Sequence, residues 1–293
     1  MEKIICDEKY RGDFLSSFQE KYPWCECGKI GRSILTRDIH YYKIGEGSHN
    51  ILCVGAHHAL EYITSLALFN FIDFLCENKT RGGIYWGVNL AFLLQKFTYW
   101  VVPCMNPDGV ELYFHGIGEN PLSERQRRMC GGEDFSEWQA NARGVDLNHN
   151  YKVGFAEYKV IELREGTRAG KTRFSGEYPE SEPETASLAN FVRSVNLSAI
   201  VSLHTQGREI YYKPLTERVS KMAERLAVSI GYRAALAEGT AAFGGLSDYT
   251  GEALGIPSFT VELGYGKNPL PDEDLPELTE SLRKLLITLP TYL

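Results

Sequence analysis

Four segments of the chain have the apolar pattern of buried strands. Three are nearly continuous apolar runs, as central strands covered on both faces tend to be, and the fourth alternates between polar and apolar residues. They are Ile51–Val54, Phe97–Val102, Ala199–Leu203 and Ser258–Leu263. Helix-like segments lie between them. This alternation favours a single α/β domain in which helices cover both faces of a parallel or mixed sheet.

Apolar residues at helical spacing predict the main helices. The stretch from Tyr62 to Cys76 is mostly apolar and predicts a well-buried helix. Ser181 and Glu184 have the S-x-x-E spacing of a capping box, which predicts a helix start at Ser181. The apolar stripes are Leu188, Phe191, Val192 and Val195; then Val219, Met222, Leu226 and Ile230, stopped by Gly231; then Leu278, Leu282, Leu285 and Leu289, after a start near Asp274.

Composition and charge narrow the class of protein. The 293 residues are 43% hydrophobic and 24% charged, which is ordinary for a globular enzyme. The net charge of −7 argues against nucleic acid as a partner. No apolar run reaches the ~20 residues of a membrane helix, and the first residues lack the apolar core of a secretory signal. We therefore expect a cytoplasmic protein with no membrane partner. Seven cysteines, an odd number, fit reduced thiols.

His58, Glu61 and His204 form a candidate zinc site. His58 and Glu61 follow the first predicted strand, and His204 follows the third. Imidazole and carboxylate are ligands of catalytic zinc, which takes three protein ligands and keeps one position open. His57 is a poor alternative to His58, because adjacent side chains on extended backbone point to opposite faces. Taken alone, the H-x-x-E spacing is a weak motif, and the alternative is two structural histidines with a glutamate that complements a helix dipole.

Further segments occur with these residues in an order that resembles a known family. They are Pro103–Gly109, Arg143–Asn148, Ser181–Thr185 and Phe259–Leu263. Together with the zinc motif they resemble the zinc carboxypeptidases of the carboxypeptidase A type, from about Tyr41 to Leu263. Within that family, Trp138–Asn148 and Leu203–Gly207 resemble most the bacterial γ-D-glutamyl-L-diamino acid endopeptidases, which cut the peptide stems of peptidoglycan. The resemblance implies one zinc peptidase domain over residues 1–293, with residues 1–40 as a lead-in and no wall-binding repeats. It also implies a mixed, mostly parallel sheet of about eight strands.

The resemblance assigns roles to the catalytic candidates. His58, Glu61 and His204 bind one zinc ion, and Glu262 is the general base that activates water. A buried carboxylate on a strand is costly unless it serves a function or is paired, so the alternative for Glu262 is a structural salt bridge. Arg143 is the candidate for stabilising the oxyanion, although the family's arginine directly follows a tryptophan and Gln139 follows Trp138 here. Arg143 could instead brace its loop.

The substrate pocket departs from the family's digestive members. Asn148 matches the asparagine that binds a terminal carboxylate, but His149 stands where those enzymes have an arginine. Counting back from Glu262 places Thr240 at the position of their mobile tyrosine and Ser247 at the position that selects side chains. Asp248 is a candidate partner for a substrate amino group, or a structural residue. These departures beside an intact metal set favour hydrolysis of a different, polar substrate, such as one that contains diaminopimelate.

The sequence therefore predicts a zinc metallopeptidase that acts on a peptide or muropeptide, most specifically at the γ-D-glutamyl-diaminopimelate bond. An ordinary carboxypeptidase is the first alternative, and His149 and Thr240 count against it. An amidoacid deacylase would lack the Asn106–Gly109 and Ser181–Thr185 segments. A catalytically inactive protein that binds wall peptides is the third alternative, and the complete ligand set argues against it. The sequence does not indicate an oligomeric state.

Overall fold

The computed structural model describes residues 3–293. A mixed sheet of eight strands forms its centre, in the order β1-β2-β6-β3-β7-β10-β8-β9. The central strands β6, β3, β7 and β10 run parallel to one another, and the antiparallel pairs lie nearer the two edges. The strands are β1 (Glu26–Arg32), β2 (Asp38–Gly45), β3 (His49–Val54), β6 (Phe97–Val102), β7 (Leu197–Thr205), β8 (Gly207–Tyr212), β9 (Arg233–Ala235) and β10 (Ser258–Tyr265), and β4 (Ile84–Tyr85) pairs with β5 (Val88–Asn89) in a separate hairpin.

The four strands predicted from the apolar pattern are the four central strands. Burial on both faces explains why β3 reads as a continuous apolar run. Ile51 and Cys53 pack in one apolar cluster, whereas Leu52 and Val54 pack in another, because successive side chains of a strand point to opposite faces. The α/β prediction and the mostly parallel sheet of about eight strands are confirmed.

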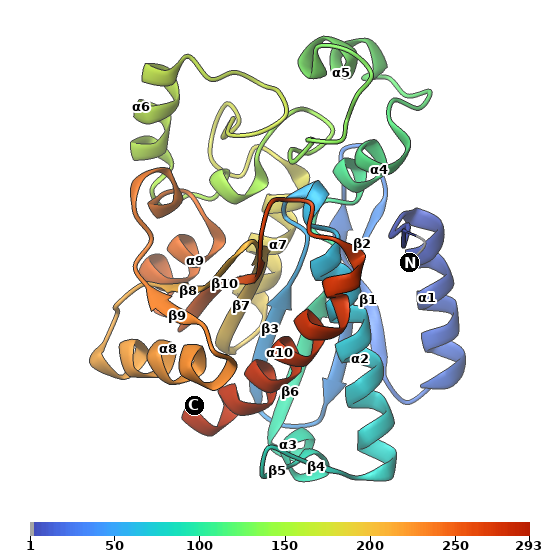
Figure 1. The fold of residues 1–293 in the computed structure, drawn as a ribbon, viewed down its shortest axis with the longest axis vertical. Coiled ribbons are helices and arrows are strands. Elements are labelled where there is room, and N and C mark those ends of the chain that lie inside the picture. Colours follow the sequence, from blue (N-terminus) through green and yellow to red (C-terminus); the bar gives the residue numbers. More distant parts are fainter. Residues whose placement is uncertain (1–2) are drawn as a thin grey trace.

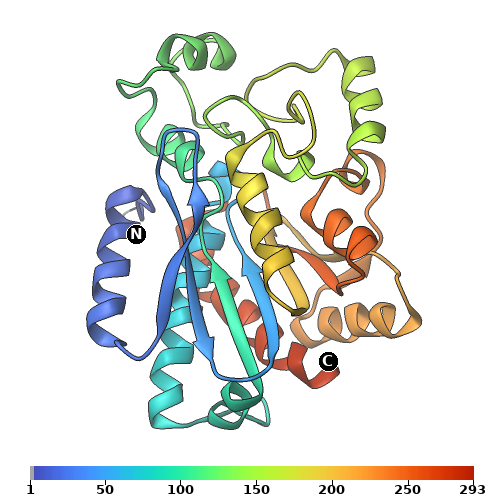
Figure 2. The same ribbon diagram turned by 180° about the vertical axis from the view of Figure 1, so that it is seen from behind.

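Helices cover both faces of this sheet. Figure 1 shows α2 and α10 in front of the strands, and Figure 2, seen from behind, shows α7 on the opposite face. The helices are α1 (Glu8–Lys21), α2 (Ile63–Arg81), α3 (Leu90–Lys96), α4 (Pro107–His115), α5 (Ser123–Cys130), α6 (Phe155–Glu165), α7 (Pro183–Ser194), α8 (Glu217–Ile230), α9 (Leu246–Asp248) and α10 (Leu275–Thr288).

The predicted helices are present, with one correction at a helix start. The capping box at Ser181 is wrong: α7 begins after Glu182, and no side chain caps it. Pro183 at the first helical position already has the backbone angle that a helix needs. The hydroxyl of Ser181 instead donates to the Glu182 carboxylate. The later ends agree with prediction, since Gly231 closes α8 in the left-handed conformation and α10 begins after Asp274.

Residues 3–40 pack against the rest of the domain. Strand β1 lies at one edge of the sheet, and Phe14 of α1 packs its ring 4.3 Å from that of Phe69 on α2. By length and composition, the stretch Ala59–Arg81 could cross a membrane, but 89% of its most apolar part is buried inside the protein. This stretch contains α2, the buried core helix that the sequence predicts.

The order of the central strands in the sheet opens a crevice at one end of the sheet, where a ligand can bind. Strand β6 pairs with one edge of β3, and β7 pairs with its other edge. Such a reversal of direction opens a crevice at the carboxyl ends of parallel strands. The segment between residues 106 and 180 gathers over this end (Figure 1). Residues 106–180 therefore lie over the carboxyl ends of β3 and β7.

Candidate metal centre and active site

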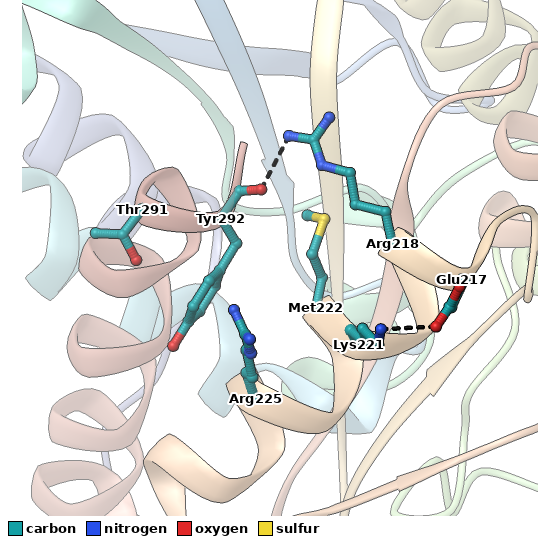
Figure 3. Close-up of a pocket in the computed structure, with 7 residues that line it drawn as sticks. All are labelled: Glu217, Arg218, Lys221, Met222, Arg225, Thr291 and Tyr292. Carbon is teal, nitrogen blue, oxygen red and sulfur yellow. Dashed lines mark hydrogen bonds and ion pairs between the residues drawn. The ribbon is translucent and has the colours of Figure 1, made fainter.

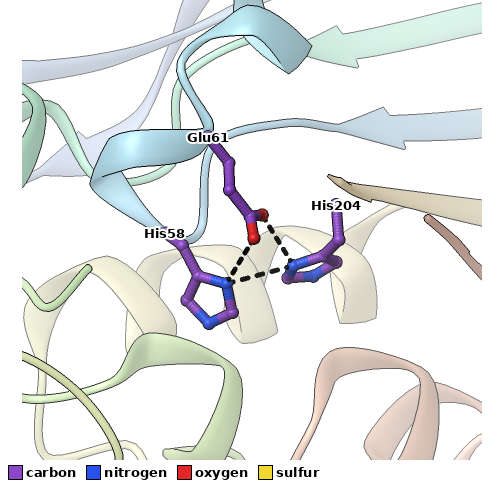
Figure 4. A group of neighbouring side chains, drawn as sticks. All are labelled: His58, Glu61 and His204. Carbon is purple, nitrogen blue, oxygen red and sulfur yellow. Dashed lines mark hydrogen bonds and ion pairs between the residues drawn. The ribbon is translucent and has the colours of Figure 1, made fainter. Parts of the chain in front are cut away.

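The three predicted zinc ligands converge at the carboxyl ends of β3 and β7. His58 is extended and precedes a short 3-10 turn, Ala59–Glu61, so the chain reverses and both side chains face His204 on β7. The Nδ1 atom of His204 lies 3.3 Å from Nδ1 of His58 and 3.1 Å from Oε2 of Glu61, and Nδ1 of His58 lies 3.3 Å from Oε1 of Glu61. Figure 4 shows the three side chains pointing toward one another.

This donor set fits zinc in chemistry and in spacing. Two ligands at ~2.0–2.1 Å from a tetrahedral zinc ion lie ~3.3 Å apart, which is close to the three observed separations. Glu61 and His204 are buried, and the imidazole of His58 is partly exposed. The set therefore offers three ligands while one side stays accessible, as a catalytic zinc site requires.

Asp146 and Asn268 hold two of the ligands in place. An Oδ1 atom of Asp146 lies 3.0 Å from Nε2 of His58, on the side of the ring away from the other ligands. Burial alone would raise the pKa of Asp146, but the neighbouring His58 outweighs it and lowers that pKa well below its usual range. Asn268 donates from Nδ2 to Oε1 of Glu61 over 3.0 Å. Partners of this kind fix the orientation and basicity of metal ligands.

His57 is not part of the ligand set, although its ring lies 5.8 Å from that of His204. Its Nε2 atom lies 2.9 Å from the Tyr151 hydroxyl, and the ring is fully buried. Among the described residues, the only cluster of His, Cys, Asp and Glu side chains with metal-ligand spacing is His58, Glu61 and His204.

Glu262 lies on β10, beside the metal ligands. In the parallel pairing of β10 with β7, Glu262 is the direct partner of His204. Burial and the nearby Glu61 carboxylate raise the pKa of Glu262 well above its ordinary value. In the described part of the chain no basic side chain forms an ion pair with Glu262. A carboxylate in such surroundings is suited to taking up a proton.

A cavity of about 210 Å³ opens beside the ligands. Its lining is polar but contains no arginine and no lysine among the described residues. The lining residues are His58, Glu61, Gln139, Asn148, His149, His204, Thr205, Gln206, Tyr211, Ala237, Ala241, Gly245, Ser247, Thr260, Glu262 and Asn268.

Three of the predicted substrate-binding residues lie in this cavity. Asn148 and His149 come from the 3-10 turn Leu147–His149, and Ser247 lies on α9 with its hydroxyl 3.0 Å from that of Thr260. The Nδ1 atom of His149 contacts the backbone oxygen of Phe243 at 2.9 Å, so Nδ1 carries the proton. Burial lowers the pKa of His149. This residue is therefore a neutral imidazole and does not replace a guanidinium.

Arg143, Asp248 and Thr240 lie outside the lining of this cavity. Arg143 donates from Nε to Glu182 over 2.9 Å and from a terminal nitrogen to the Ser181 oxygen. It faces a separate cavity of about 370 Å³. Asp248 is buried and pairs with Lys213 at 2.8 Å. Both charged groups therefore already have partners within the protein, and Ala241 rather than Thr240 faces the metal cavity.

Among the described lining residues, six polar ones had no predicted role: Gln139, Thr205, Gln206, Tyr211, Thr260 and Asn268. Gln139 directly follows Trp138, at the place where the resemblance calls for an arginine, and Gln206 lies in the Leu203–Gly207 segment that carries the resemblance. A further cavity, about 400 Å³, lies between α8 and the last turn of the chain (Figure 3). It contains none of the predicted site residues.

Comparisons with known proteins agree with this geometry. A family model described as zinc carboxypeptidase matches residues 12–284. The chain is 31% identical over 262 residues to γ-D-glutamyl-L-diamino acid endopeptidase 1 of Lysinibacillus sphaericus, a match that covers 88% of this chain and 65% of that protein. The chain thus spans just under two thirds of that relative.

Solved structures share the fold at lower identity. Bovine thrombin-activatable fibrinolysis inhibitor aligns with a TM-score of 0.76 and 20% identity, over 97% of this chain and 96% of that one. Murein-tripeptide amidase of Escherichia coli O157 aligns with a TM-score of 0.55 and 21% identity, over 89% of this chain and 91% of that one.

Proposed function

Because the chain belongs to the zinc carboxypeptidase family, whose members are peptidases that use one zinc ion, we propose that it hydrolyses the bond between γ-D-glutamate and a diamino acid in peptidoglycan stem peptides. The zinc peptidase assignment rests on the family match and the intact ligand triad. The choice of bond is our proposal, and the activity named for the Lysinibacillus relative supports it.

One observation in particular supports a substrate other than that of a digestive carboxypeptidase. The cavity beside the ligands has no arginine or lysine among its described lining residues. A guanidinium binds a terminal carboxylate through two parallel charge-assisted hydrogen bonds, and none of the described residues brings such a group to this cavity. The amide and hydroxyl groups of the lining suit a substrate with several polar groups, such as a diamino acid with a second amine and carboxylate.

Each residue of the site has a separate role in the reaction. When zinc is bound, it supplies a Lewis acid that polarises a carbonyl group and acidifies water. His58, Glu61 and His204 hold the ion, while Asp146 and Asn268 fix His58 and Glu61. Glu262 accepts a proton as water oxygen adds to the scissile carbonyl carbon. It then returns that proton to the leaving amine as the carbon–nitrogen bond breaks, which yields a carboxylic acid and an amine; transfer of the acid's proton to the amine leaves a carboxylate and an ammonium group.

Mass spectrometry of cleaved peptides tests the proposal. L-Ala-γ-D-Glu-meso-diaminopimelate and an α-linked peptide of the same composition are incubated separately with zinc-loaded protein, and the Glu262→Gln variant is the control. We expect diaminopimelate to be released from the γ-linked peptide alone and the variant to be inactive. Cleavage of the α-linked peptide alone would make the protein an ordinary carboxypeptidase. No cleavage of either peptide, with zinc bound, would point to another acyl substrate.

A further inference from the structure

Three side-chain amides line the metal cavity, those of Gln139, Asn148 and Gln206. Each side chain ends in a primary amide, and all three line the cavity. We propose that Gln139 and Gln206 act with Asn148 as uncharged donors that bind substrate oxygen atoms. The site then does not require a free carboxylate on the residue that follows the cleaved bond. This inference rests on the proposed function and concerns which substrates the same site accepts.

The carbonyl oxygen of each amide is held by the protein. The backbone N–H of Asn268 donates to Oε1 of Gln206 over 3.0 Å, and that of Leu246 donates to Oδ1 of Asn148 over 3.2 Å. A backbone N–H can only donate, so the atom that it meets in each amide is the oxygen. The hydroxyl of Thr172 donates to Oε1 of Gln139 over 2.6 Å. All three amides are therefore oriented.

The NH2 groups of these amides are left for a ligand. Among the described residues, no hydrogen bond involves Nε2 of Gln139 or Gln206, or Nδ2 of Asn148. None of these nitrogen atoms is among the buried, unpartnered polar atoms. They are therefore accessible in a cavity that the three side chains line. Each NH2 group offers two donors.

The backbone places both glutamines next to the metal ligands. The N–H of Ala59, the residue after His58, donates to the backbone oxygen of Gln139 over 2.9 Å. Gln206 lies two residues after His204 and has a φ of +88°, a left-handed conformation that is costly for a residue with a Cβ atom. Strain of this kind collects at functional sites. Here it accompanies the turn from β7 into β8 that brings Gln206 to the cavity.

Uncharged donors discriminate less than a guanidinium. An amide N–H donates to a carbonyl oxygen and to a carboxylate oxygen alike, whereas a guanidinium favours a carboxylate, with which it forms two parallel bonds between opposite charges. The cavity has no arginine and no lysine among its described lining residues. A diamino acid whose carboxyl is free, amidated or joined to a further residue should therefore be accepted with similar efficiency.

Three matched substrates test this inference. They are L-Ala-γ-D-Glu-meso-diaminopimelate with a free carboxyl next to the cleaved bond, with that carboxyl as the amide, and with D-Ala added to it. We expect kcat/KM values for the three within about tenfold of one another. A preference of more than about 100-fold for the free carboxyl would overturn the proposal.

Two isosteric variants, Gln139→Glu and Gln206→Glu, convert donors to acceptors, and Gln95→Glu, at an exposed position of α3, controls for the added charge. We expect each cavity variant to lower kcat/KM about tenfold or more for all three substrates, with zinc content unchanged by elemental analysis. Values equal to those of Gln95→Glu would overturn the proposal. If γ-linked peptides are not cleaved but α-linked ones are, the proposed function fails, and the same free and amidated pair in α-linked form still tests the donors.

Discussion

Asp146 lies 3.0 Å from Nε2 of His58, while the other ring nitrogen of His58 faces Glu61 and His204. The carboxylate itself is held by the backbone N–H groups of Asn148 and Arg173. One loop thus orients a metal ligand and carries Asn148 into the substrate cavity. The contact between Asp146 and His58 therefore links zinc binding to the position of the loop that carries Asn148.

Replacing Asp146 by Asn should weaken zinc binding ~10–100-fold, because partners of metal-bound histidines contribute about that much. Competition with a chromophoric chelator measures the dissociation constant. Asp13→Asn, on an exposed part of α1, removes a charge far from the site and should leave it unchanged. Equal zinc affinity in native protein and Asp146→Asn would show that Asp146 does not support the ligand.

Replacing Arg143 by Gln should change kcat/KM by less than about tenfold. Arg143 pairs with Glu182 and faces another cavity, whereas loss of a group that stabilises an oxyanion costs ~10²–10³ in kcat. Steady-state kinetics on the γ-linked tripeptide, with circular dichroism to confirm folding, separates the two roles. A ~10³-fold decrease in kcat in a folded variant would show that Arg143 stabilises the oxyanion.

Lys213 should contribute to stability rather than to catalysis. It pairs with buried Asp248 at 2.8 Å and with Glu252 at 2.9 Å. Lys213→Met leaves the Asp248 carboxylate buried without its cation, which costs ~3 kcal/mol when a buried pair is broken. Urea denaturation measures the change. Lys221→Met removes an exposed pair with Glu217 and should cost less than ~1 kcal/mol. Similar losses in both variants would contradict the buried pairing.

Glu184 should make the protein less stable as pH rises. Burial raises the pKa of Glu184 to about 8, so the folded state keeps a proton that the unfolded chain releases near ~4.3. Folding then binds a proton between these pH values, and the free energy of unfolding falls as pH rises from about 4.5 to about 8. Urea denaturation across this range should show the fall in native protein and a weaker one in Glu184→Gln. Identical pH profiles of stability in the native protein and in Glu184→Gln would contradict this role of Glu184.

The sequence predicts those structural features whose pattern involves residues close together along the chain. Central strands such as β3 are apolar on both faces, and long stripes such as that of α8 have one clear period, so both were predictable. The outer strands β1, β2, β8 and β9 are short or carry many polar residues, and no pattern marked them. His58 and Glu61 share a turn, which made them recognisable.

Contacts made by distant segments were not predictable. Asn268 meets Glu61 across 207 positions of the chain, and no local pattern records such a pairing. Arg143 belongs to a recognisable segment, but its direction depends on Glu182, which comes from another loop. Ser181 has the spacing of a cap, yet Pro183 and the neighbouring side chains determine where α7 begins.

The most direct test of the central claim is a competition in one vessel. Equal amounts of L-Ala-γ-D-Glu-meso-diaminopimelate and its α-linked isomer are mixed with zinc-loaded protein, and mass-labelled diaminopimelate from each is counted over time. We predict that label from the γ-linked peptide dominates, and that Glu262→Gln keeps its zinc but is slower by ~10²–10⁴-fold. Label released mainly from the α-linked isomer, or an unchanged rate in Glu262→Gln, would contradict the account.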